Sequence, residues 1–142
     1  MIILEMNVFG FELLKETVLP QILGKDSPEI LYWVGKQVAR KYPLETIDEV
    51  ISFFEKANWG TLLLTKEKKS EMYFQLTSTL IEERLKANEL AHFQLESGFL
   101  AQQLEHIQQC VTESYEDPKK KNSIVTFQVK WDDKDIVNRE EK

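Results

Sequence analysis

The spacing of apolar side chains divides the chain into helical and strand-like regions. Apolar residues recur every three or four positions, the period of a helix with one buried face, in three successive stretches at 9–23, 27–43 and 46–58. Apolar and polar residues instead alternate, as in half-buried strands, in the stretches at 59–77 and 111–131. Between these two alternating regions lies the stretch 92–110, which we interpret as the principal helix of the fold.

Local signals mark the ends of the first three predicted helices. Gly24 follows the first helix, as a glycine commonly follows a helix end. Ser27 can cap the second helix, and Pro28 suits its first position. The spacing of Thr46 and Glu49 is that of a capping box, which predicts the start of the third helix.

Gly35 falls in the middle of the second predicted helix. A glycine at such a position costs about 1 kcal/mol relative to alanine, because it loses more backbone freedom on folding. We therefore expect another backbone to pass close to this helix at Gly35.

Each alternating region predicts a β-hairpin. The first hairpin turns at 66–69 and the second at 118–122. The residues expected together on one face of their clearest strands are Met72, Phe74 and Leu76 in the first and Val125, Phe127, Val129 and Trp131 in the second. Between the hairpins, the capping-box spacing from Thr79 to Glu82 favours a short helix over 80–88, although this segment also fits a continued strand.

These parts predict an α+β domain, in which N-terminal helices and a long central helix pack on an antiparallel sheet of about four strands. A chain of 142 residues fits one domain, which we place at 1–131. The polar residues 132–142 have little to bury, so we expect them to form a mobile tail.

Charge and cysteine content narrow the possible partners and the compartment. The formal net charge of −6 opposes docking onto nucleic acid or an anionic membrane surface. The apolar run at 1–4 is too short to span a bilayer. A single cysteine cannot form an internal disulfide, and the first residues lack the pattern of a signal peptide. We therefore expect a cytoplasmic protein with no nucleic-acid partner and no membrane insertion.

Candidate chemistry gathers on the principal helix. A helical wheel places a core stripe on one side of it, formed by Leu100, Leu104, Ile107 and Val111. Phe99, His106 and Cys110 fall on a neighbouring row that borders this stripe. His106 and Cys110 are four residues apart, so both side chains could reach one metal ion or one haem edge. They supply only two ligands, whereas structural zinc sites use four and catalytic zinc sites three.

Glu96 and Trp33 are two further candidates for binding a ligand. Glu96 falls inside the apolar arc of the principal helix, where a buried carboxylate could have a raised pKa or contact a polar ligand group. Near a helix N-terminus it also fits a simple partner of the helix dipole. Trp33 lies beside the core stripe of its helix rather than in it, and an exposed aromatic side chain of this kind can line a pocket or a partner surface.

Three segments of the sequence resemble known proteins. FGFELLKETVLPQILGKDSPEILYWVGKQVARKYPL, WGTLLL and FQLESGFLAQQLEHI closely resemble the YslB-like family of uncharacterised bacterial proteins, over residues 9–132. More remotely, the order of elements and the LESGFLA segment resemble the four-vinyl-reductase ligand-binding fold, which is shared with the TRAPP tethering subunits. This resemblance implies a TRAPP-like architecture that binds a small or hydrophobic ligand or dimerises through helices. The final hairpin lacks the cysteines that many of those relatives carry, so a metal or thiol site of their kind is not implied.

The sequence thus predicts a non-enzymatic binding or interaction module. It would hold a small hydrophobic ligand, a protein partner or both, and form a homodimer through its N-terminal helices. The predicted ligand-binding residues are Trp33, Glu96, Phe99, His106 and Cys110; we predict no catalytic residue, metal site or cofactor. The alternative is a metal or haem sensor that uses His106 and Cys110, and a third hypothesis is an enzyme with Glu96 as acid or base.

Overall fold

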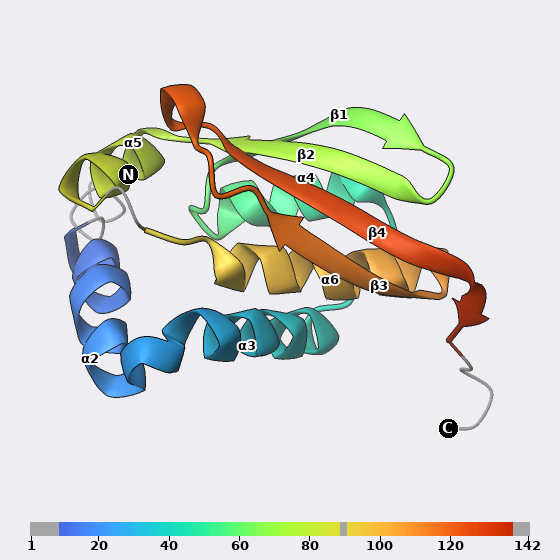
Figure 1. Cartoon of the computed structure of the whole chain (residues 1–142), viewed down its shortest axis with the longest axis horizontal. Coiled ribbons are helices and arrows are strands. Elements are labelled where there is room, and N and C mark those ends of the chain that lie inside the picture. The colour runs from blue at the N-terminus through green and yellow to red at the C-terminus, as the bar shows by residue number, and fades with distance from the viewer. Residues whose placement is uncertain (1–8, 89–90, 138–142) are drawn as a thin grey trace.

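The computed structural model describes residues 9–88 and 91–137 (Figure 1). Residues 9–13 are helical and continue directly into the π-helix η1 and the helix α2, so that residues 9–23 form one N-terminal helix. The elements that follow the first helical residues are η1 (Leu14–Val18), α2 (Leu19–Leu23), η2 (Gly24–Asp26), α3 (Ser27–Lys41), α4 (Ile47–Lys56), β1 (Thr61–Lys68), β2 (Glu71–Thr77), α5 (Thr79–Ala87), α6 (Gln94–Gln108), β3 (Cys110–Glu116), η3 (Lys121–Ser123) and β4 (Val125–Ile136).

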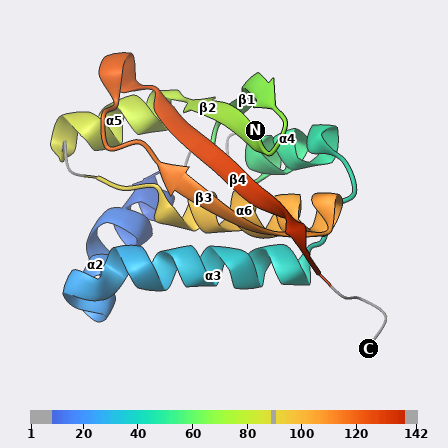
Figure 2. The ribbon, with the colours of Figure 1, turned by 45° about the vertical axis from the view of Figure 1, so that its right-hand side comes forward.

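The fold is α+β, as the sequence predicts, with helices packed on a four-stranded antiparallel sheet. The strand order is β1-β2-β4-β3, so β1 and β3 form the two edges. Helices α4 and α6 lie against one face of the sheet, and α3 packs on the other side of α6 (Figures 1 and 2). The principal helix of the sequence analysis, α6, therefore lies between the sheet and α3.

The alternation predicted for the strands is confirmed. In β2, Met72, Phe74 and Leu76 are buried, and in β4 the buried positions are Val125, Phe127 and Val129. These side chains pack against apolar residues from α4, β1 and α6, chiefly Val50, Phe54, Leu62, Leu100 and Leu104. The core thus fills the space between the sheet and the two helices that cover it.

Two glycines bring the backbones of α3 and α6 into contact. A Cβ atom at Gly35 would overlap the carbonyl oxygen of Leu95 and lie 2.8 Å from the amide nitrogen of Phe99. A Cβ atom at Gly98 would in turn overlap the carbonyl oxygen of Tyr32. The expected close approach at Gly35 is therefore confirmed, and its partner backbone is that of α6.

The structure confirms one of the predicted helix-capping residues and changes two others. Thr46 Oγ1 accepts a hydrogen bond of 3.1 Å from the Glu49 amide, as the capping box requires. The start predicted for the helix after the first hairpin is one residue late, because Ser78 and not Thr79 accepts the capping bond, from the Ile81 amide at 3.1 Å. This helix, α5, settles the choice between helix and strand for the segment. Ser27 does not cap α3, since it is the first residue inside that helix.

The predicted boundary of the mobile tail is wrong. Strand β4 continues past Trp131 to Ile136, because the beginning of β3 provides it with a partner: Ile136 pairs with Cys110. The amide of Val137 also donates a hydrogen bond of 2.9 Å to the carbonyl oxygen of Gln109. Residues 138–142 of the predicted tail lie outside the described residues.

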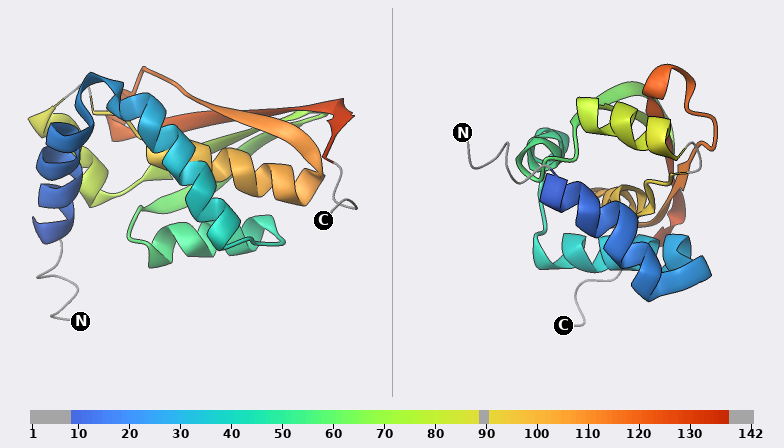
Figure 3. Two further views of the ribbon diagram at one scale, coloured as in Figure 1. Left: turned by 90° about the horizontal axis from the view of Figure 1, so that it is seen from below. Right: turned by 90° about the vertical axis from the view of Figure 1, so that its left-hand side faces the viewer.

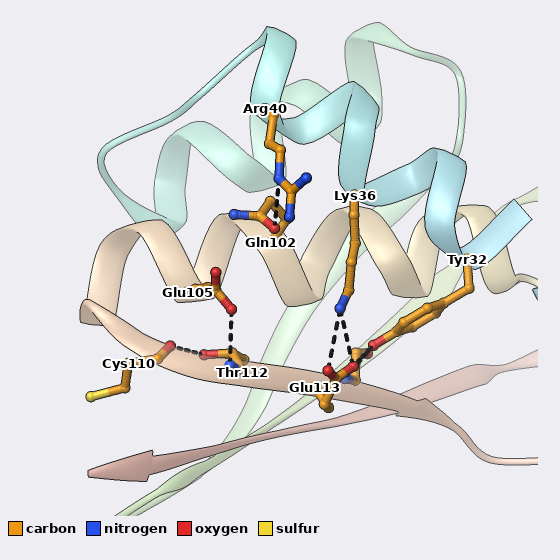
Figure 4. A network of polar contacts seen from close by, with 9 residues as sticks. Tyr32, Lys36, Arg40, Gln102, Glu105, Cys110, Thr112 and Glu113 are labelled. Atoms are coloured by element: carbon orange, nitrogen blue, oxygen red, sulfur yellow. Dashed lines mark hydrogen bonds and ion pairs between the residues drawn. The ribbon is translucent and has the colours of Figure 1, made fainter. Parts of the chain in front are cut away.

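The outer edge of β3 is covered by side chains from the helices, as Figure 4 shows. The Thr112 amide donates a hydrogen bond of 3.2 Å to Glu105 Oε1, and the Ser114 amide donates one of 3.0 Å to the hydroxyl of Tyr32. That hydroxyl donates in turn to Glu113 Oε1 at 2.5 Å. Two backbone donors of an edge strand, which would otherwise be open to pairing with another strand, are thereby satisfied within the chain.

Candidate functional site

The N-terminal helix, α5 and the beginnings of α3 and α6 come together at one end of the molecule (Figures 1 and 3). Residues from these segments line a cavity of about 240 Å³. Its polar and charged lining comes from segments far apart in the sequence: Lys15, Glu16, Ser27, Arg84, Asn88, His92 and Glu96. Its apolar lining is formed by Pro20, Pro28, Leu31, Ala91 and Leu95. The cavity therefore combines apolar walls with a cluster of charges.

Glu96 is the most deeply buried charged residue of this cluster. It stands in the first turn of α6 and is 1% exposed. Lys15, itself 9% exposed, donates a hydrogen bond of 2.6 Å from Nζ to Glu96 Oε2. The second carboxylate oxygen, Oε1, is also buried. The Glu96 carboxylate is thus held inside the protein by Lys15.

Arg84 fixes a second part of the cavity wall. Its Nη2 donates a hydrogen bond of 2.9 Å to the carbonyl oxygen of His92, just before α6 begins. Its guanidinium forms an ion pair with Glu16 and lies over the ring of Phe93, 4.1 Å from the centroid. The buried Arg84 therefore links α5, the N-terminal helix and the segment that leads into α6.

The π-helix η1 explains why two consecutive charged residues reach the same cavity. In η1 the Leu19 amide bonds to the carbonyl oxygen of Leu14, five residues back rather than four. This wider turn brings both Lys15 and Glu16 to the cavity, while Leu14 and Val18 are exposed. Single turns of π-helix are frequent at functional sites, which agrees with its position here.

The charges around Glu96 determine its ionisation. Burial raises the pKa of the Glu96 carboxyl, but the nearby Lys15 and Arg84 charges lower it more, so that its pKa lies below the ordinary value. Glu96 is therefore a carboxylate at neutral pH. The raised pKa that burial alone would give is not found.

His92 lies on the same cavity wall and is half-buried. Burial is the main cause that lowers the pKa of its imidazole; Glu116 opposes this effect and Arg84 adds to it. His92 is consequently neutral at pH 7. The cluster then carries two positive charges, from Lys15 and Arg84, and two negative charges, from Glu16 and Glu96.

The residues predicted as ligand-binding do not form one site. Phe99 is fully buried in the core, where its ring lies 4.5 Å from that of Phe53 and 5.2 Å from that of Trp59, measured between centroids. Trp33 is 60% exposed on α3 and does not line the cavity. Of the five predicted residues, Glu96 is the one that lines it.

The predicted row of Phe99, His106 and Cys110 is wrong. Helix α6 ends at Gln108, and Gln109 turns the chain with a left-handed φ of 62°, so Cys110 begins β3 instead of continuing the helix. For the same reason Val111 does not extend the core stripe and is 38% exposed. His106 and Cys110 are thus not one helical turn apart, as the sensor hypothesis required.

The environments of His106 and Cys110 differ. His106 Nε2 lies 2.8 Å from Glu45 Oε2. Cys110 is buried and free; burial and then the carboxylates of Asp133, Asp132 and Asp135 raise the pKa of its thiol, which disfavours the thiolate that binds metals. Among residues 9–88 and 91–137, no three side chains of His, Cys, Asp or Glu are grouped to hold a metal ion.

Sequence reasoning missed Lys15, Glu16 and Arg84. Lys15 carried a usable signal, because it stands four residues after Phe11 and four before Leu19 and so places a charge on an apolar row, as Glu96 does on α6. Glu16 and Arg84 carried none, since their pairing joins residues 68 positions apart and depends on the π-helical turn.

Known proteins can now be compared with this geometry. A family model described as "Protein of unknown function (DUF2507)" matches residues 8–130. The chain belongs to this family. The uncharacterized protein YslB of Bacillus subtilis (strain 168) is 46% identical to this chain over 134 residues, which cover 94% of this chain and 90% of YslB. The resemblance to the YslB-like family stated from the sequence is confirmed.

A solved structure confirms the more remote resemblance. The DUF2507 chain is similar to a vinyl-4-reductase family protein from Methanocaldococcus jannaschii, with a TM-score of 0.57 over 72% of this chain and 68% of the other. At 18% identity this likeness concerns the fold alone. In the described part of the DUF2507 chain, no helix is both long and apolar enough to cross a membrane.

Proposed function

We propose that this protein is a non-enzymatic binding module that holds a small organic molecule in the cavity beside Glu96. The observation that carries the proposal is the cavity itself, whose lining combines apolar walls with the buried charged residues Lys15, Arg84 and Glu96. Small-molecule sites typically combine apolar walls with a few polar groups that converge on the ligand. The apolar walls beside it, among them Leu31 and Leu95, supply the contact area that small ligands need.

A binding role fits the site better than a catalytic one. Lys15 fixes Glu96 by a direct hydrogen bond, and Glu96 stays ionised at neutral pH, so it lacks the raised pKa of a general acid. As a base it would need a pKa close to the working pH, which its lowered pKa does not provide. The ion pair of Glu96 and Lys15 therefore shapes the cavity wall rather than transferring a proton.

Ligand occupancy can be tested by native mass spectrometry on freshly purified protein, followed by a fragment screen observed in amide NMR spectra. We expect a bound mass or fragments that shift the amide signals of Ala91, Leu95 and Glu96. The variant Ala91→Leu fills the cavity and should abolish these shifts, whereas Ser52→Leu on the exposed face of α4 should not. Apo mass together with no fragment that shifts these signals would contradict the proposal.

The same proposal includes the homodimer expected from the sequence. The outward face of the N-terminal helix exposes a stripe of apolar side chains, namely Phe9, Leu13, Leu14, Val18 and Ile22, which are exposed by 37–71%. The charged residues of this helix, Glu12, Lys15 and Glu16, are less exposed than the stripe. Although the net charge of the chain is −6, two copies of the stripe can therefore meet without bringing like charges of this helix face to face. A second copy of the chain is therefore the occupant that we propose for this stripe.

Sedimentation velocity at micromolar concentration tests the dimer. We expect the wild type to sediment as a dimer and the double variant Leu13→Glu, Ile22→Glu as a folded monomer. Leu63→Glu, a matched change at a 53% exposed apolar residue of β1, should leave the dimer intact. A monomeric wild type would refute the dimer without bearing on the cavity.

A further inference from the structure

We infer that the N-terminal helix, residues 9–23, couples the cavity to self-association. One part of this helix lines the cavity, while its outward face carries the stripe that we propose for the second copy. This inference rests on the proposed function and adds the regulation of the same site. The cavity is complete only while the helix is held in place, and a second copy of the chain holds it there.

The helix presents different residues to the two surfaces. Lys15, Glu16 and Pro20 line the cavity, whereas the lining includes none of the five stripe residues. Figure 3 shows this helix at one end of the molecule, where its outward face is open to a second copy. A change at one surface can therefore affect the other only through the position of the helix.

The contacts that hold the helix to the rest of the chain are mainly charged. Lys15 is the one residue of 9–23 that is buried, and it bonds to Glu96 of α6. Glu16 forms an ion pair with Arg84 of α5. The apolar residues outside the stripe are only partly buried: Phe11, Leu19 and Leu23. Because elements with few buried apolar contacts open at a low free energy, this helix is displaced more easily than α3 and α6.

A displaced helix would not keep the stripe together. Isolated helices shorter than about 12–15 residues are marginal in water. This one also contains a π-helical turn, and Pro20 provides no amide donor within it. The five stripe residues therefore form one continuous surface only while the helix is docked on the protein.

Docking of the helix and dimerisation consequently favour one another. Two equilibria that are linked through one element change each other by the same factor. A second copy bound to the stripe keeps Lys15, Glu16 and Pro20 at the cavity. In the opposite direction, loss of the charged contacts weakens the dimer even when every stripe residue is unchanged.

Alkylation of a cysteine placed in the cavity wall tests the effect of the dimer on the cavity. Leu31 is 7% exposed and lines the cavity from α3, so a thiol there should react faster with iodoacetamide when the helix is displaced. In Leu31→Cys, peptide mass spectrometry separates this label from one on Cys110. Adding Leu13→Glu and Ile22→Glu, which break the dimer outside the cavity lining, should accelerate the reaction at position 31 at least about fivefold. Adding Leu63→Glu instead should leave the rate unchanged.

Sedimentation velocity tests the opposite direction. Glu16→Gln removes the ion pair with Arg84 and changes no stripe residue, and we expect its dimer to be at least about fivefold weaker than that of the wild type. Glu12→Gln is the matched control, because it makes the same change of charge on the same helix outside the cavity lining. Its dimer should be as tight as that of the wild type. The labelling experiment leaves both ion pairs intact, so it decides the inference even if circular dichroism shows Glu16→Gln to be unfolded.

The outcomes separate the coupling from the proposed function. Equal labelling rates in the dimer and in the monomeric variant, or a folded Glu16→Gln variant with a dimer as tight as the wild type, would refute the coupling and leave the cavity and the dimer as independent features. A monomeric wild type would refute the coupling together with the dimer. Neither readout requires a ligand, so failure of the coupling is distinguishable from failure of the proposed binding role.

Discussion

Lys15 Nζ and Glu96 Oε2 are joined by a hydrogen bond of 2.6 Å between two buried residues that lie 81 positions apart in the chain. A buried ion pair of this kind contributes little compared with an apolar pair of the same volume, but removal of one partner leaves the other charge buried and unpaired. The pair therefore links the N-terminal helix to α6, and substitution of either residue alone should destabilise the protein.

We predict that Lys15→Met and Glu96→Leu each lower the free energy of unfolding by about 3–5 kcal/mol. The double variant Lys15→Met, Glu96→Leu should be more stable than either single variant, since no charge remains unpaired. Urea unfolding of the four proteins measures this coupling in a double-mutant cycle. Additive effects of the two substitutions would show that the pair does not act as a unit.

The lowered pKa of His92 predicts a loss of protein stability in mildly acid solution. Its pKa in the folded protein is below the ordinary value, so the unfolded chain binds the proton first as the pH falls. The contribution of neutral His92 is present above the unfolded pKa of about 6.5 and is lost progressively as the pH falls through the folded pKa. Urea midpoints measured from roughly pH 7 to pH 5 should fall less steeply in His92→Gln than in the wild type. Parallel profiles would contradict the prediction.

The glycine contacts predict large effects from the addition of one methyl group. Gly35→Ala and Gly98→Ala force a Cβ atom into the backbone of the facing helix, so we expect each to lower the free energy of unfolding by about 3 kcal/mol or more. Gly10→Ala is the matched control, because a Cβ atom there meets nothing within 4 Å and alanine favours the helix. Thermal and urea unfolding measure the three variants; equal stability of Gly35→Ala and Gly10→Ala would contradict the close packing.

We predict a smaller loss of stability when the Tyr32 hydroxyl is removed from the edge of the sheet. Tyr32→Phe removes the acceptor of the Ser114 amide and the donor to Glu113, and we expect a loss of about 1–2 kcal/mol. Tyr115 is a tyrosine of β3 that is 54% exposed. Tyr115→Phe should therefore change stability by less than about 0.5 kcal/mol. Hydrogen exchange of the Ser114 amide should also accelerate in Tyr32→Phe alone; unchanged exchange would show that the hydroxyl does not protect this edge.

Much of the fold could be predicted from signals that act within a few residues. The alternation in β2 and β4 reports the buried face of a sheet directly, and the Thr46 cap depends on an amide three residues away. Gly35 was informative because its cost inside a helix needs a tertiary explanation. These features each have a cause that is visible in one short segment.

The site was less predictable because its parts meet only in the folded chain. Glu96 stood out as a carboxylate on an apolar arc, but its partners come from the N-terminal helix and α5. The wheel that aligned His106 with Cys110 assumed a helix that continues to Cys110, whereas the left-handed turn at Gln109 starts a strand. A residue other than glycine adopts such a turn without a clear signal in the sequence.

The glycine contact between α3 and α6 has a consequence for how fast the proposed ligand would exchange with solvent. Because these two helices touch through their backbones, the part of the cavity wall that they carry, including Leu31 and Leu95, belongs to one rigid unit. Another part of the wall belongs to the N-terminal helix, which ends at Gly24, where φ is 69°, and is held by the ion pairs of Lys15 and Glu16. Movement of this part of the wall would break charge contacts rather than separate packed backbones, so variants of the Lys15–Glu96 pair should change the residence time of the proposed ligand more than variants of exposed α3 residues.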